Sequence, residues 1–254
     1  MQPLTLMPLS GLPEIRPGDD LAGLLTKALA AQALQPRDGD AIVVCQKIVS
    51  KSEGRRVALD SVAPSARALD LARRCGKDPA LVELVLREST DVVRCVPDVL
   101  IVRHRLGFVV ANAGIDQSNV LDGDRHALLL PLDPDESARR LREALHQRLG
   151  VQLAILINDS FGRAWREGVV GACIGCAGFN PLVDRRGDPD RNGRILKMTQ
   201  IAAGDELAAA ASLIMGQADE GIPAVWVRGL DWRMLEPSSG ASRLVRPLER
   251  DLFK

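Results

Sequence analysis

Ile155-Leu-Ile-Asn-Asp-Ser-Phe-Gly-Arg-Ala-Trp-Arg-Glu-Gly168 is the stretch of sequence from which the fold is best predicted. It overlaps residues 151–157, which are apolar at almost every position and therefore predict a strand covered on both faces. Asp159 and Ser160 follow directly, where the backbone is expected to leave the sheet. Ligands commonly bind at this edge of open α/β sheets, so the stretch predicts a site as well as a strand.

The side chains of this stretch suit a charged ligand. A carboxylate beside a hydroxyl can hold a divalent metal, and Arg163 and Arg166 can bind a phosphate or a carboxylate. The alternative interpretation is a polar turn with solvated arginines. Trp165, between the two arginines, can either stack on an aromatic ligand or belong to the core.

Composition limits the class of protein. The chain has 254 residues, 46% of them hydrophobic, which excludes global disorder. Lys plus Arg and Asp plus Glu are both 33, and this balance argues against a nucleic-acid-binding protein. No apolar run is long enough to span a bilayer, and the N-terminal residues do not resemble a signal peptide. We therefore expect neither nucleic acid nor membrane as a partner.

The cysteines and histidines suggest neither disulfides nor zinc. Five cysteines are an odd number and do not form a disulfide framework, so a reducing cytoplasm is expected. Cys173 and Cys176 form a Cys-x-x-Cys pair, but no second pair stands at a useful spacing. We interpret both as small apolar residues in a Gly/Ala-rich segment.

Helices and strands alternate without a strict βαβ rhythm. Apolar periodicity predicts a helix that begins at Leu21, directly after the acidic capping residues Asp19 and Asp20. Further helices are predicted over residues 64–75, 79–88, 135–149 and 205–215. Strands are predicted over residues 41–45, 99–102, 108–112, 128–130, 151–157 and 224–228. Residues 184–194 predict a long turn or exposed hairpin, and residues 237–241 a loop. The expected fold is mixed α/β (α+β), a single domain over residues 1–254 with two interleaved lobes.

Polar clusters follow three of the predicted strands. One is basic with hydroxyls (residues 46–55), and two carry a carboxylate beside amides (residues 111–119 and 158–160). Phosphoryl chemistry needs this combination, because carboxylates hold a metal while cations neutralise the developing charge. We therefore predict a metal-assisted phosphate site. The alternative is that each cluster is an ordinary turn.

Two common nucleotide-binding motifs are missing. The sequence contains neither Gly-x-x-x-x-Gly-Lys-Ser/Thr nor Gly-x-Gly-x-x-Gly, so the fold is neither a P-loop nor a Rossmann fold. Residues 215–222, with Gln217, Asp219 and Glu220, can contribute to a nucleotide site. By themselves they are typical of a helix end followed by a turn.

Six motifs in a fixed order carry a resemblance to a known family. They are residues 11–21, 43–55, 112–119, 130–135, 159–168 and 215–223. Together they resemble the coenzyme F420-0:L-glutamate ligase family, the γ-glutamyl ligases of deazaflavin coenzyme biosynthesis. The resemblance runs from Gly11 to about Gly229 and implies that family's α/β fold, in the single-domain form without a nitroreductase-like extension.

The resemblance also implies a reaction. GTP would phosphorylate the terminal carboxylate of the coenzyme precursor F420-0, and the amine of L-glutamate would displace phosphate from the acyl phosphate to form an amide. Further γ-linked glutamates can follow. A homodimer and two divalent ions, Mg²⁺ or Mn²⁺, are implied, and a role for K⁺ is left open. The alternative is a nucleotide- and metal-binding regulator on the same scaffold, without turnover.

Site residues follow from the same motifs, position by position. The implied metal ligands are Asp116, Asp159, Ser160 and Gln217. The expected catalytic residues are Asp116, Asp159, Arg163 and Arg166, and the two arginines are assigned to substrate anions. The implied nucleotide contacts are Gly11, Leu12, Pro13, Glu14, Gln46, Lys47, Lys51, Asn119, Met215, Gly216, Gln217, Ala218, Asp219, Glu220, Gly221 and Ile222.

Two positions depart from the family's pattern. Ser160 stands where threonine is expected, and its hydroxyl can still bind a metal. Gln46 and Lys47 stand where some archaeal members have Ser-Thr, so the nucleotide contacts there are open.

Overall fold

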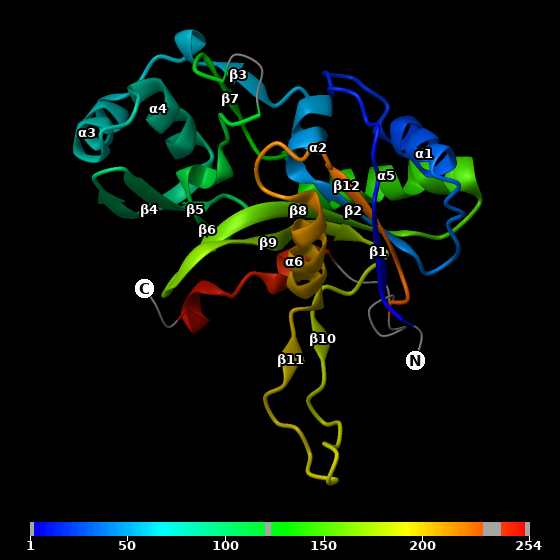
Figure 1. Ribbon diagram of the computed structural model, residues 1–254. Helices are drawn as coiled ribbons and strands as arrows, with labels where there is room; N and C mark the ends of the chain where they lie inside the picture. The colour runs from blue at the N-terminus through cyan, green and yellow to red at the C-terminus, as the bar shows by residue number, and fades with distance from the viewer. Residues whose placement is uncertain (1–2, 120–122, 231–239, 252–254) are drawn as a thin grey trace.

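The largest sheet is built around one pair of parallel strands (Figure 1). The computed structural model describes residues 3–119, 123–230 and 240–251. The sheet order is β1-β12-β2-β8-β9. The bounds are β1 (Thr5–Pro8), β2 (Ala41–Cys45), β8 (Ala154–Arg163), β9 (Arg166–Ala177) and β12 (Ala224–Arg228). β2 and β8 run parallel, whereas the other neighbouring strands are antiparallel.

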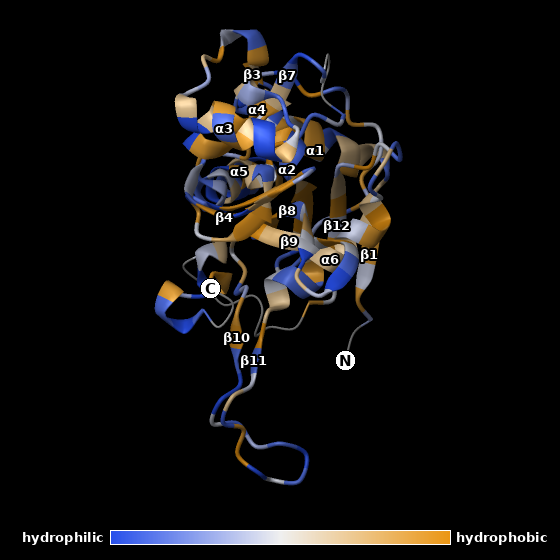
Figure 2. Ribbon diagram, turned by 90° about the vertical axis from the view of Figure 1, so that its left-hand side faces the viewer, coloured by the Kyte–Doolittle hydropathy of each residue, from blue (hydrophilic) through white to orange (hydrophobic). Residues whose placement is uncertain are grey.

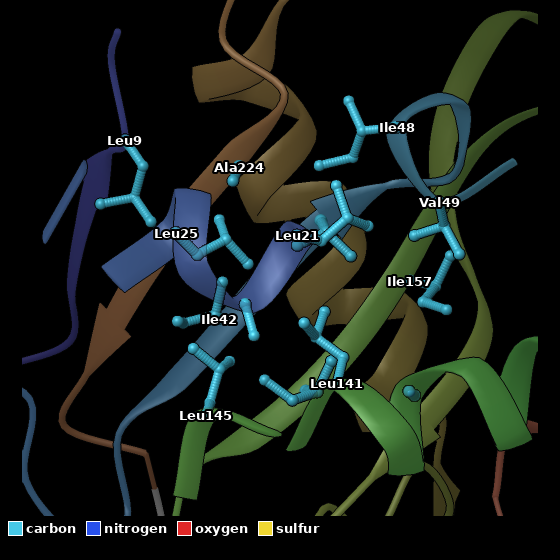
Figure 3. Close-up of a cluster of buried hydrophobic side chains, with 14 of the residues drawn as sticks. Leu9, Leu21, Leu25, Ile42, Ile48, Val49, Leu141, Leu145, Ile157 and Ala224 are labelled. Carbon is cyan, nitrogen blue, oxygen red and sulfur yellow. The ribbon is translucent and has the colours of Figure 1, made fainter. Parts of the chain in front are cut away.

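Both faces of this sheet are covered, which explains the unbroken apolar runs of its central strands. Ile155 and Ile157 point into one core, which also includes side chains of α1 (Leu21–Ala31) and α5 (Pro134–Leu149) (Figure 3). Leu156, between them, points into a second core beneath α6 (Ala203–Met215). Because successive side chains of a strand face opposite sides, burial on both sides requires apolar residues at every position.

A smaller lobe is inserted between α2 (Gln46–Ser52) and α5, and it has a core of its own. It contains α3 (Ala66–Cys75), α4 (Pro79–Arg87), the sheet of β4 (Ser89–Val96), β5 (Val99–His104) and β6 (Val109–Ala111), and the pair β3 (Arg56–Ala58) and β7 (His126–Leu128). Short 3₁₀ turns are η1 (Leu59–Ser61), η2 (Asn112–Gly114), η4 (Ala241–Leu244) and η5 (Leu248–Arg250). The predicted mixed α/β fold with two interleaved lobes is confirmed.

A long hairpin projects from the body below α6 (Figure 1). Its paired base consists of β10 (Val183–Asp184) and β11 (Gln200–Ile201), and Figure 2 shows that its far end is largely hydrophilic. The expected exposed hairpin over residues 184–194 is therefore confirmed. Most of the loop expected over residues 237–241 lies outside the described residues. None of the helices in the described ranges is long and apolar enough to cross a membrane.

The predicted helices are confirmed within one or two residues, because their ends carry recognisable caps. Asp20 accepts a hydrogen bond from the Gly23 backbone N–H at the start of α1. Gly150 ends α5 in the left-handed conformation at φ 71°.

Several predicted strand boundaries are wrong. β8 begins at Ala154 and continues to Arg163, because the antiparallel ladder with β9 extends along the whole hairpin. Asp159 and Ser160 therefore lie within a strand and not beyond its end. The strands predicted at 108–112 and 128–130 are β6 and β7, and the basic cluster after β2 is the helix α2.

Cys173 and Cys176 lie on β9 and are buried free thiols, as their interpretation as apolar residues requires. Two residues three apart in a regular strand face opposite sides. Here a bulge shifts the register between Ile157 and Asn158, and both thiols join the core beneath α6.

A buried carboxylate joins the small lobe to the segment that leads into α5. Glu88 accepts hydrogen bonds from Arg55 at 2.9 Å and from Arg105 at 3.0 Å. The same arginines donate to the backbone carbonyls of Leu130 and Leu132. Burial alone would raise the pKa of Glu88, but nearby His104 and the two arginines lower it to about 2.

We expect Glu88 to make the stability of the protein fall in acid. A carboxyl whose folded pKa is depressed contributes stability above its unfolded pKa, about 4.3, and loses it as the pH falls towards 2. The contribution at neutral pH is about 2 to 3 kcal/mol. Urea unfolding from pH 6 to 2.5 should show a shallower loss for Glu88→Gln than for the wild type. The variant Glu143→Gln, at an exposed position, should lose stability with pH as the wild type does. If the stability of Glu88→Gln fell in parallel with that of the wild type, Glu88 would not be the cause of the acid sensitivity.

Candidate functional site

One cleft of about 720 Å³ opens at the carboxyl end of β2, beside residues 158–160 in the middle of β8. The parallel register pairs Cys45 with Asn158, so the residues that follow them start from the same edge of the sheet. The segment before β12 crosses the same edge because β12 runs antiparallel to β2. The cleft is lined by residues 12–15, Cys45, Lys47, Ile48, Lys51, Asp116, Ser118, Asn119, residues 158–160 and residues 215–223.

The small lobe contributes Asp116 to this cleft. Asp116 pairs with Leu128 in an isolated bridge, which fixes its backbone beside β7. Its Oδ2 lies 2.5 Å from the Lys47 Nζ and accepts a hydrogen bond from the Gln46 Nε2 at 2.8 Å. A carboxylate from one lobe thus meets a cation and an amide from the other.

Asp159 is the buried carboxyl of the site. Its exposed fraction is 9%, and its Oδ1 accepts a hydrogen bond from the Ser160 backbone N–H at 2.8 Å. Burial, and secondly the negative charge of Asp116, raise its pKa to about 7. Two carboxylates held near each other in this way favour either a shared proton or a bound cation.

Gln217 connects the end of α6 to β8. Ser160 Oγ donates a hydrogen bond to Gln217 Oε1 at 2.6 Å, and Gln217 Nε2 donates to Ser212 Oγ at 2.6 Å. Gly216, which ends α6, has φ 72°, a conformation that favours glycine. The turn there brings Gln217 over the strand.

Two further contacts cross the cleft. Lys51 Nζ lies 2.6 Å from the Glu14 carboxylate, joining α2 to the segment that precedes α1. Asn119 Nδ2 donates to the Ala218 carbonyl at 3.0 Å, joining the small lobe to the segment after α6.

The structure brings together most of the predicted site residues, with four exceptions. All four implied metal ligands line the cleft, as do the implied nucleotide contacts other than Gly11 and Gln46. Gln46 is fully buried behind Asp116. Arg163 and Arg166 pair with each other at the end of the β8–β9 hairpin and do not line the cleft of their own chain. Trp165 beside them is 87% exposed, which excludes the core role considered for it.

Sequence reasoning gave no role to Asn158, Ser118 and Ser212. Asn158 is buried at the cleft, and among the described residues its Oδ1 has no hydrogen-bond partner. Ser118 lies 3.4 Å from the Lys47 Nζ. Asn158 and Ser118 lie within the recognised polar clusters, whereas nothing local distinguishes Ser212 in its alanine-rich helix.

The oxygen atoms of the cleft suit a hard cation. Carboxylates, a hydroxyl and a side-chain amide are the ligand types that Mg²⁺ and Mn²⁺ prefer. Within the described part of the chain, no group of three His, Cys, Asp or Glu side chains is placed to hold a metal. A site at Asp116 and Asp159 would therefore need the Ser160 hydroxyl and the Gln217 amide oxygen.

Comparison with known proteins shows the family of the chain. Residues 11–229 match the family model described as F420-0:Gamma-glutamyl ligase. A coenzyme F420:L-glutamate ligase of Methanothermobacter thermautotrophicus is 48% identical over 251 residues, 99% of each chain. The enzyme of the same name from Methanopyrus kandleri is 47% identical, covering 95% of this chain and 94% of that protein. The chain is thus an enzyme of the acid–amino-acid ligase class. It belongs to the F420-0:gamma-glutamyl ligase family, which confirms the resemblance.

We expect Asp159→Asn to stabilise the protein in the absence of metal. The folded pKa of about 7 lies above the unfolded value of about 3.9, so the wild type loses stability as the pH rises from 4 to 7. An asparagine removes this cost, which is at most about 4 kcal/mol at pH 8. The melting temperature in EDTA should therefore rise at pH 8 and change little at pH 4. Asp60→Asn, at an exposed position, should change the melting temperature at neither pH. An equal rise for Asp159→Asn at pH 4 and pH 8 would show that removal of the buried charge is not the cause.

Proposed function

We propose that this enzyme ligates L-glutamate to the terminal carboxylate of coenzyme F420-0, using GTP and divalent metal. The observation that carries the proposal is that one cleft holds two carboxylates, Asp116 and Asp159, together with the ammonium groups of Lys47 and Lys51. Phosphoryl transfer to a carboxylate requires both kinds of group at one place. The names of the relatives support the substrates, F420 and glutamate.

The metal ligands in this proposal are Asp116, Asp159, Ser160 and Gln217. When bound, Mg²⁺ or Mn²⁺ neutralises the charge of phosphate oxygens during transfer. Lys47 pairs with Asp116 in the structure. Occupancy of Asp116 by a cation would release the Lys47 ammonium, which lies in the same cleft, to bind a phosphate. Replacing K⁺ by Na⁺ in the assay tests the role for K⁺ that the family resemblance leaves open.

The nucleotide would lie along the remaining walls of the cleft. The segments 12–14 and 215–222 both line the cleft, as does Lys51, which is paired with Glu14. Asn119 already bonds to Ala218, so contacts from both lobes would enclose the nucleotide.

The reaction would proceed in two transfers. The F420-0 carboxylate oxygen attacks the γ-phosphorus of GTP, GDP leaves, and a mixed acyl phosphate forms. The neutral amine of glutamate then attacks the acyl carbon, and phosphate leaves with the electrons of the C–O bond. The amine loses one proton as the amide forms. The cations of the cleft stabilise negative charge in both steps.

We further propose that the enzyme acts in the cytoplasm, as its free cysteines indicate, and that it forms the homodimer that the family resemblance implies. Arg163 and Arg166 remain assigned to substrate anions in this proposal. Since they do not line the cleft of their own chain, their contact with substrate would be made at the end of the hairpin.

The ligase and the regulator are distinguished by the mass of the product. We expect mass spectrometry of F420-0, incubated with enzyme, GTP, L-glutamate and Mn²⁺, to show a gain of one or more glutamyl units. Asp159→Asn should abolish this gain because it removes a charged metal ligand, although the variant stays folded. No gain with the wild type, with GTP still bound, would favour the nucleotide-binding regulator.

Arg166→Ala should raise the KM for F420-0 by about tenfold or more, the scale of a lost charge-assisted contact, and leave the KM for GTP within about twofold. Steady-state kinetics with each substrate varied in turn measures both constants. Arg186→Ala on the projecting hairpin is the matched control. An unchanged KM for F420-0 would remove Arg166 from the substrate site.

A further inference from the structure

Two glutamine–serine pairs are hydrogen-bonded to residues that line the cleft, one to Asp116 and the other to Ser160. In the first, Gln46 and Ser50 lie one turn apart in α2 and are both fully buried. Ser50 Oγ donates to Gln46 Oε1 at 2.9 Å, and Gln46 Nε2 donates to Asp116 Oδ2 at 2.8 Å. The hydroxyl is thus linked to the carboxylate through the amide.

The second pair lies at the end of α6. Ser212 is 8% exposed, and its Oγ accepts a hydrogen bond from Gln217 Nε2 at 2.6 Å. Gln217 Oε1 faces the other way and accepts from Ser160 Oγ at 2.6 Å. This arrangement mirrors the first pair, with the direction of the serine hydrogen bond reversed.

The two pairs differ in which end of the amide faces the site. A side-chain amide has an oxygen that accepts and an NH₂ that donates, and only the oxygen can bind a cation. Ser50 binds the oxygen of Gln46, so the NH₂ faces the carboxylate of Asp116. Ser212 binds the NH₂ of Gln217, so the oxygen faces Ser160 and the cleft.

We propose that Ser50 and Ser212 are positioning residues that orient the ligands of the metal site through Gln46 and Gln217. This inference rests on the metal site proposed above. It assigns the Gln46 side chain to Asp116 and not to the nucleotide, and therefore explains why this glutamine is buried and absent from the cleft lining. Groups that hold metal ligands from behind typically change metal affinity 10- to 100-fold when removed.

A neighbouring serine shows what a purely local hydroxyl does. Ser52, two residues after Ser50 in α2, donates its hydroxyl hydrogen to the Val49 carbonyl at 2.8 Å. This is the usual behaviour of serine in a helix. Ser52→Ala is therefore a matched control, with the same chemical change on the same helix.

The test is a titration of the purified, nucleotide-free protein with Mn²⁺, with free Mn²⁺ measured by electron paramagnetic resonance. Ser50→Ala and Ser212→Ala should each bind Mn²⁺ about tenfold or more weakly than the wild type. Ser52→Ala should bind it within about twofold. Because no nucleotide is present, a residue that contacts only GTP would not change this measurement.

Threonine and valine variants separate the effect of the hydroxyl on Mn²⁺ affinity from the effect of packing. The comparisons are Ser50→Thr with Ser50→Val, and Ser212→Thr with Ser212→Val. Threonine and valine have nearly the same shape, so both should disturb the helix equally, and only threonine should retain Mn²⁺ affinity. Melting temperatures that fall while Mn²⁺ affinity stays unchanged would show a merely structural role and overturn the inference. A wild type that binds no Mn²⁺ would instead refute the proposed metal site itself, and this inference with it.

Discussion

The parallel register between β2 and β8 is the constraint on which the rest of the structure depends. It places Cys45 beside Asn158, so that α2 and the polar half of β8 start from one edge of the sheet. β12 continues the same sheet in the opposite direction and brings the segment after α6 to that edge. A shift of one residue would turn every side chain of β8 to the other face and exchange the two cores.

The site that this register creates lowers the stability of the fold, because it contains a buried carboxyl. Asp159 is buried beside a second carboxylate, and burial is the larger cause of its raised pKa. The protein tolerates this because the surrounding strands are covered on both faces and provide ample apolar burial. A strained or costly group in a well-packed frame is typical of functional sites.

Much of this architecture could be predicted because its cues are local. Asp20 and Gly150 mark helix ends, and an apolar run identified the first part of β8, residues 154–157. The continuation of β8 through Asp159 could not be predicted, because it depends on pairing with the glycine-rich β9, which lacks a strand pattern of its own. The metal-site and nucleotide-site residues were grouped through the family resemblance. The burial of Gln46 was not expected, because it depends on a contact with Asp116, 70 positions along the chain.

The insertion of the small lobe has a thermodynamic consequence. Asp116 belongs to the small lobe and Asp159 to the body, so the cleft draws its two carboxylates from separate cores. A ligand that holds both carboxylates stabilises the packing of one lobe on the other. By reciprocity, the free energy by which the ligand stabilises this packing equals the free energy by which the packing strengthens ligand binding. Residues at the surface between the lobes therefore contribute to the ligand affinity of the site, even where they take no part in the chemistry.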